Sequence, residues 1–229
     1  LGGLFLTHGD DNGLVLTPKL APIQVMIIPI NSRVVKKNAL ESARDLYKYA
    51  KSIEKELTDK GIRVRIDAKT QIDEMFEESS ESPGRKFNKW EVKGVPLRFE
   101  IGDTEVDSKI VTVARRDTLE KLNIRREVVV AETIKLLNEM QKALFGKTKA
   151  FLDENTREVT SFDEFKTIMK STRGFIRAFW CEDTACEEKI KQETKASTRC
   201  LPLDTKEEKG SCVYCNKPAV HRWLFAQAY

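Results

Sequence analysis

Several features that mark common protein classes are missing from this chain of 229 residues. It has no run of about 18 apolar residues, so we expect no membrane-spanning helix. Its first residues carry neither an initiator Met nor a charged region before an apolar core, which argues against a signal peptide and suggests a start inside a larger protein. P-loop, G-x-S-x-G and H-E-x-x-H patterns are also missing. We therefore expect a cytoplasmic protein without a common catalytic motif in this sequence.

Cysteine is absent from the first 180 residues, and histidine occurs only twice. The five cysteines are Cys181, Cys186, Cys200, Cys212 and Cys215. An odd count without a signal peptide argues against a disulfide framework and favours a metal site or plain thiols. The two histidines, His8 and His221, are too far apart in sequence to suggest a pair, and we expect structural roles for both.

Four of the cysteines form two close pairs, Cys181-x4-Cys186 and Cys212-x2-Cys215. Four thiolates can close a tetrahedral zinc site, which would be structural because no position is left open. The second pair resembles a zinc-knuckle turn, in which backbone N–H groups can bond to the sulfurs. The alternative is four ordinary reduced cysteines. We expect Cys200 to be a buried apolar thiol rather than a fifth ligand.

The net charge of +4 is small, but its distribution is uneven. Residues 67–82 hold six acids and one base, whereas residues 85–126 hold eleven bases and seven acids. The second stretch is a candidate phosphate-facing surface, with an ordinary solvated surface as the alternative.

Hydrophobic periodicity predicts the order of elements. Asn12-Gly13 between apolar runs predicts a hairpin within residues 1–21. An α/β unit follows, with strands at 23–30, 62–66, 95–101 and 109–114 and helices at 40–57 (capped by Asn38) and 87–92; its first crossover should join parallel strands. A long amphipathic helix at 126–146 leads to a helix capped at Ser161 and to strands at 174–180 and 220–225.

Three longer motifs carry a resemblance. They read THGDDNGLVLTPKLAPIQV at 7–25, SPGRKFNKWEVKGVPLRFEIG at 82–102 and RRDT with EK within 115–121. The first resembles the end of the catalytic domain of prolyl-tRNA synthetases of the archaeal and eukaryotic type, and the others resemble the anticodon-binding domain of these class II enzymes. The paired cysteines and the aromatic end of the chain are similar to the C-terminal zinc domain of that family. The chain departs from the family pattern at Thr17, Arg85, Asp103 and Thr104.

The resemblance implies a fold class, a domain order and a set of site residues. The fold would be α/β: a mixed sheet flanked by helices, followed by a small α+β cysteine-rich zinc domain. The domains would be a catalytic-domain remnant at 1–21, an anticodon-binding domain at 22–125 and a zinc-binding domain at 126–229. Glu91 would accept from a guanine, with Arg98 and Lys121 as its cationic partners. The surface around Lys86, Lys89 and Lys93 would hold phosphates.

The parent enzyme implied by the resemblance is a proline–tRNA ligase. It would use proline, ATP and Mg²⁺, act on proline tRNA and dimerise through its catalytic domain. The adenylate-forming motifs precede these residues in the family, so we expect no catalytic residues and no activity from this chain alone. Two alternatives remain open: a stand-alone tRNA-binding protein and a zinc-ribbon interaction module without tRNA affinity. Without the resemblance, Glu91 and Arg98 would be interpreted as surface charges.

Overall fold

The computed structural model describes residues 2–30, 39–67 and 82–228. The chain divides into two compact units, Leu1–Gly146 and Lys147–Tyr229. The expected acidic stretch at 67–82 lies outside the described residues except at its two ends, and the expected cap Asn38 also lies outside them. The domain boundaries at 21/22 and 125/126 remain predictions about functional parts.

The first unit contains a five-stranded mixed sheet in the order β2-β1-β3-β4-β5. Its strands are β1 (Val25–Ile30), β2 (Val64–Ile66), β3 (Leu97–Gly102), β4 (Ile110–Arg115) and β5 (Lys121–Arg125). Strand β1 is parallel to β2 and β3, whereas β4 and β5 continue the sheet in antiparallel pairing. The expected parallel crossover is confirmed, because α2 (Ala39–Asp59) joins β1 to β2.

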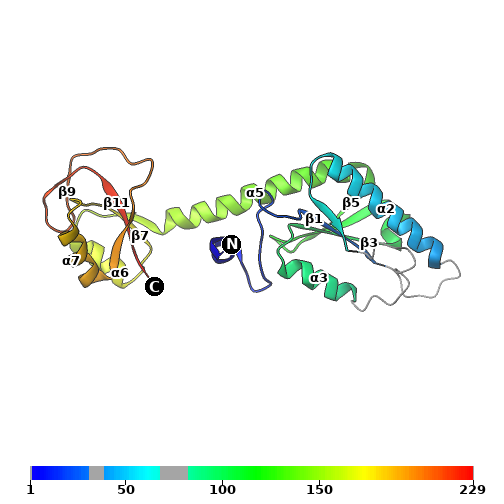
Figure 1. The fold of residues 1–229 in the computed structure, drawn as a ribbon, viewed down its shortest axis with the longest axis horizontal. Coiled ribbons are helices and arrows are strands. Elements are labelled where there is room, and N and C mark those ends of the chain that lie inside the picture. Colours follow the sequence, from blue (N-terminus) through cyan, green and yellow to red (C-terminus); the bar gives the residue numbers. More distant parts are fainter. Residues whose placement is uncertain (1, 31–38, 68–81, 229) are drawn as a thin grey trace. The chain divides into compact units, whose positions relative to one another are not determined.

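Helices cover both faces of this sheet (Figure 1). Val25 and Ile27 of β1 pack in a core with α2 and the first half of α5 (Val129–Glu154). Their neighbours Met26 and Ile28 pack on the other face against α3 (Pro83–Val92). Successive side chains of a strand point to opposite faces, so the continuous apolar run of β1 fits a strand buried on both sides.

The predicted hairpin at the N-terminus is wrong. Residues Gly2–His8 form the short helix α1, and the turn that follows closes through mutual backbone hydrogen bonds of 3.0 Å between Asp10 and Gly13. The next residues pair elsewhere, because Leu14 N–H donates to the Val92 carbonyl. The turn signal was correct, but the apolar residues before it have no strand partner, and a helix satisfies their backbone groups locally.

The second unit contains a four-stranded sheet in the order β6-β7-β11-β8 and a two-stranded ribbon. Its elements are β6 (Thr156–Glu158), α6 (Phe162–Lys170), β7 (Phe175–Phe179), α7 (Thr184–Thr194), β8 (Ala196–Cys200), β9 (Gly210–Ser211), β10 (Pro218–Ala219) and β11 (Arg222–Gln227). The Ser161 hydroxyl accepts from the Glu164 N–H at 3.2 Å, as its capping pattern predicted. Phe165 and Phe225 meet edge to face in a fully buried core.

Several elements were not anticipated. They are α4 (Asp103–Asp107), the turn of 3₁₀ helix at Arg126–Val128, β5, β6, α7 and β8 to β10. Helix α5 continues past Gly146 to Glu154, because a glycine inside a helix costs only about 1 kcal/mol.

Among the described residues, every helix is too short or too polar to cross a bilayer.

Candidate functional site

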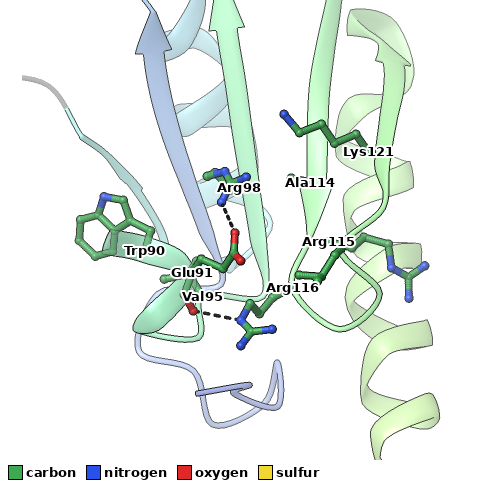
Figure 2. Close-up of a pocket in the computed structure, with 9 residues that line it drawn as sticks. Trp90, Glu91, Val95, Arg98, Ala114, Arg115, Arg116 and Lys121 are labelled. Atoms are coloured by element: carbon green, nitrogen blue, oxygen red, sulfur yellow. Dashed lines mark hydrogen bonds and ion pairs between the residues drawn. The ribbon is translucent and has the colours of Figure 1, made fainter. Parts of the chain in front are cut away.

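A pocket of about 200 Å³ opens in the first unit, where α3 ends and β3 begins (Figure 2). It is lined by Trp90, Glu91, Val95, Arg98, Ala114, Arg115, Arg116, Leu119 and Lys121. The structure thus brings together the three residues for which the resemblance implied a base-reading role, Glu91, Arg98 and Lys121.

These three residues belong to one row of alternating charges, which runs through Glu91, Arg98, Glu100 and Lys121. Glu91 Oε2 lies 3.2 Å from Arg98 Nη1, and Glu100 Oε1 accepts from Arg98 Nε at 3.1 Å and Nη2 at 3.0 Å. Glu100 Oε2 accepts from Lys121 Nζ at 2.7 Å. The inner members, Arg98 and Glu100, are 12% and 8% exposed, whereas Glu91 and Lys121 are 25% and 52% exposed. Glu91 and Lys121, at the two ends of this row, are therefore the groups that a ligand can reach.

The pairing of Arg98 and Glu100 follows from strand geometry. Leu97, Phe99 and Ile101 of β3 point into the core on the α2 side, so the two charged residues between them point to the α3 side. There the Arg98 guanidinium carbon lies 4.6 Å from the ring centre of Phe87, and Lys121 Nζ lies 5.5 Å from it. Glu100 was not predicted as a site residue, although the alternation of charged and apolar residues in the strand was a usable signal.

The other two cations of the pocket are held by carboxylates. Arg115 makes two hydrogen bonds to Asp117, of 3.0 and 2.9 Å, and its side chain turns away from Glu91 (Figure 2). Arg116 is paired with Asp10 through two hydrogen bonds, of 2.8 and 2.5 Å. The four groups from Glu91 to Lys121, two acids and two bases, are formally neutral together, so this part of the pocket suits a neutral polar ligand better than an anion.

The Asp10–Arg116 pair predicts a pH-dependent stability of the first unit. Hydrogen bonding from Arg116 holds the pKa of Asp10 below its ordinary value, against the opposing effect of burial. A lowered carboxyl pKa stabilises the folded state fully above about pH 4, and this contribution is lost as the pH falls through the lowered pKa. In urea unfolding, the free energy of unfolding of wild type should therefore exceed that of Asp10→Asn, and the difference should be larger near pH 7 than near pH 3. An equal difference at both pH values would contradict this assignment.

The three predicted phosphate-binding lysines lie on α3 or at its end. Lys86 Nζ donates to the Asp67 carbonyl at 3.3 Å, and Lys89 Nζ lies 3.5 Å from the Asp67 carboxylate. Lys93 Nζ lies 4.6 Å from the ring centre of Trp90. The three ammonium groups thus share one side of α3, next to the pocket that Trp90 helps to line.

In the second unit, Cys181, Cys186, Cys212 and Cys215 form one cluster, with all four sulfurs within 4.8 Å of one another. Cys181 follows β7, Cys186 lies in the first turn of α7, and the other two lie in the turn between β9 and β10. Four converging thiols are close enough to hold a metal ion, and soft sulfur donors suit zinc.

The two turns around the cluster repeat one backbone geometry. Glu182 and Asn216, each directly after a cysteine, have φ values of 60° and 59°. In each turn the next backbone N–H, that of Asp183 or Lys217, bonds to the sulfur of the preceding cysteine. This is the N–H-to-sulfur arrangement expected from the knuckle pattern, and it stabilises the thiolate form.

The electrostatics of the cluster differ from one sulfur to the next. Burial raises the pKa of Cys186, whereas at Cys215 burial is outweighed by the Lys217 N–H and by the neighbouring thiols, which lower the pKa to about 7. Cys200 lies outside the cluster, as predicted, but the prediction that it is buried is wrong. It ends the sheet-edge strand β8, whose last two residues are exposed.

Comparisons with known proteins point to one family. A family model described as "Anticodon binding domain" matches residues 24–138, and a second, described as "Prolyl-tRNA synthetase, C-terminal", matches residues 162–229. "Proline--tRNA ligase 2" of a Bacillus cereus strain is 40% identical over 229 residues, and "Proline--tRNA ligase" of Christiangramia forsetii is 42% identical over the same length. The whole chain is covered in both, but it spans only 44% of the length of these relatives.

Proposed function

The chain belongs to the prolyl-tRNA synthetase family, of which it carries the anticodon-binding and C-terminal domains, and from this premise we propose that its Glu91 pocket reads guanine in the anticodon of proline tRNA. The observation that carries the proposal is the row of alternating charges Glu91–Arg98–Glu100–Lys121 at the pocket. In the parent protein this reading would serve a proline–tRNA ligase that uses proline, ATP and Mg²⁺ and works as a homodimer.

The chemistry of guanine fits the two accessible groups at the ends of this row of charges. Proline anticodons share two guanines, and the Watson–Crick edge of guanine offers two parallel donors, N1–H and N2–H, that one carboxylate can accept together. Glu91 is the accessible carboxylate, while O6 and N7 of the base suit the accessible ammonium of Lys121. Arg98 and Glu100 hold both ends in place, so little ordering is needed when the base enters.

The lysines of α3 would hold the RNA backbone. Lys86, Lys89 and Lys93 place three positive charges beside the neutral pocket, and their contacts with Asp67 and Trp90 leave them on the surface of the helix. Each phosphate contact releases condensed counterions, so binding should weaken steeply with added salt.

The cysteine cluster would hold one structural Zn²⁺. Cys181, Cys186, Cys212 and Cys215 supply four sulfur donors and leave no position for a substrate, which excludes a catalytic role for this ion in the proposal. The ion would hold the β9–β10 turn against α7 and the end of β7.

Replacing Glu91 tests the proposed function. Glu91→Ala should reduce the discrimination between proline tRNA and the same tRNA with both guanines replaced by adenines, by about 1–3 kcal/mol, as for one bidentate base contact. We expect an effect at the low end of this range, because Thr104 stands where the family usually has a basic residue. The measurement is the ratio of the two dissociation constants over a range of salt concentrations.

Glu127→Ala is the matched control, since Glu127 is exposed and does not line the pocket. It should leave the ratio and the salt slope unchanged. Equal binding of the two tRNAs by the wild-type chain would sink the proposal and would favour an interaction module without tRNA specificity.

A further inference from the structure

Arg116 lines the pocket, yet its charge is already used within the protein. Its side chain is only 2% exposed. Each of its three guanidinium nitrogens has a hydrogen bond: Nη1 and Nη2 donate to the two carboxylate oxygens of Asp10, and Nε donates to the backbone carbonyl of Glu91 at 3.0 Å. Arg116 is therefore almost fully buried and its charge is paired within the protein, and it binds the backbone of the residue proposed to read the base.

The segment that carries Asp10 is tightly joined to the end of α3. Leu14 N–H donates to the Val92 carbonyl at 3.0 Å, and Leu16 N–H donates to the Gly94 carbonyl at 3.2 Å. Gly94 has a φ of +72°, and a Cβ there would lie 2.4 Å from the Leu14 carbonyl oxygen. The backbone around Glu91 is thus fixed by residues 10–16, a segment that does not itself line the pocket (Figure 2).

From these contacts we propose that Asp10 and Arg116 are positioning residues for Glu91, and that they set guanine discrimination without touching the base. The inference rests on the proposed function, which it extends from the anticodon-binding domain to the segment before Pro22. Asp10 orients the planar guanidinium through two parallel hydrogen bonds, and the remaining Nε–H then meets the Glu91 carbonyl.

Removal of the Asp10 carboxylate has a specific expected consequence. Arg116 keeps its charge but loses the counter-ion that fixes its direction, and a buried cation without a partner is costly. The guanidinium can then turn toward the Glu91 carboxylate, the acid that shares the pocket with it, and compete there with the donors of guanine. The base-reading acceptor would be lost although the phosphate-binding lysines stay in place.

Asp10→Ala and Asp11→Ala form a matched pair of variants. Asp11 is the exposed neighbour of Asp10 and is not bonded to Arg116. Each chain would be titrated with proline tRNA and with the tRNA in which adenines replace both guanines. Asp10→Ala should lower the ratio of dissociation constants about 3- to 10-fold, as expected for coupled neighbouring groups. The slope of log affinity against log salt should not change, and Asp11→Ala should match wild type.

A merely structural role for Asp10 would change the affinity for both tRNAs equally and leave their ratio unaltered, and that result would overturn the inference. The near-isosteric Asp10→Asn variant must give the same reduced ratio, which guards against a folding defect of Asp10→Ala. Arg116→Lys should also lower the ratio, since one ammonium group cannot reproduce the three-nitrogen geometry. A wild-type ratio of one would instead overturn the proposed function itself, and the inference with it.

Discussion

Replacing Cys212 by serine is expected to abolish metal binding and to unfold the second unit while the first unit stays folded. Cys212 is fully buried, belongs to the four-sulfur cluster and packs in the core of the second unit with Cys186. Zinc binding by structural sites in small peptides is worth about 10–16 kcal/mol, and this free energy is coupled to folding. A unit of 83 residues, 147–229, has a small core to compensate for such a loss.

The measurement combines zinc stoichiometry with hydrogen exchange for wild type, Cys212→Ser and Cys200→Ser. Wild type should bind one zinc ion and Cys212→Ser none, and in this variant exchange should accelerate throughout the helices and strands of the second unit but not in the sheet of the first unit. Cys200→Ser is the matched control, because Cys200 is exposed and outside the cluster. Zinc-free wild-type protein, or loss of zinc from the Cys200 variant alone, would show that the site is wrongly assigned.

Replacing Phe99 by alanine is expected to destabilise the first unit by about 3–5 kcal/mol, the usual cost of removing a fully buried aromatic ring. Phe99 has no exposed surface and stands in β3 between Ile27 of β1 and Val113 of β4. No small movement of a central strand can fill the space left by the ring, since the neighbouring strands hold it by backbone hydrogen bonds on both sides. Native-state hydrogen exchange of the backbone amides of β1 and β3 would measure the loss of unfolding free energy for the first unit.

Phe145→Ala provides the control, because Phe145 is 66% exposed and its truncation leaves no cavity. It should change the stability of the first unit by less than about 0.5 kcal/mol. The zinc content should be normal in both phenylalanine variants, because the cluster belongs to the core of the second unit. Comparable destabilisation by the two variants would contradict the described core.

The sequence predicted the elements whose signals are periodic or capped. The two-sided apolar run of β1, the stripe of α2 and the Ser161 cap each correspond to an element in the structure. The prediction failed where pairing with a segment distant in the sequence decides the secondary structure. Residues 1–8 were expected to pair across the Asp10–Gly13 turn, but Leu14 and Leu16 bond to the end of α3, far along the sequence.

The candidate sites show the same division. Local spacing was sufficient for the four cysteines, because two short-range pairs limit where their sulfurs can lie. Glu91, Arg98 and Lys121 were named only through the resemblance to a family. Asp10 was missed, since its partner Arg116 is 106 residues away. Glu100 was missed although its partner Arg98 is two residues away in the same strand; its second partner, Lys121, comes from another strand. The exposure of Cys200 could not be deduced, because it depends on β8 being an edge strand.

The most direct test of the central claim pairs a change in the protein with a change in the RNA. Inosine lacks the N2 amino group of guanine, so proline tRNA with inosine in place of both guanines lacks one of the two donors that Glu91 would accept from the guanine in its pocket. Wild-type protein should bind this tRNA about tenfold more weakly than unmodified proline tRNA, within the range for a specific base contact. In Glu91→Ala the inosine penalty should be clearly smaller, because the acceptor for one of the two missing amino groups is already gone. An equal inosine penalty in wild type and Glu91→Ala would show that Glu91 does not read the guanines.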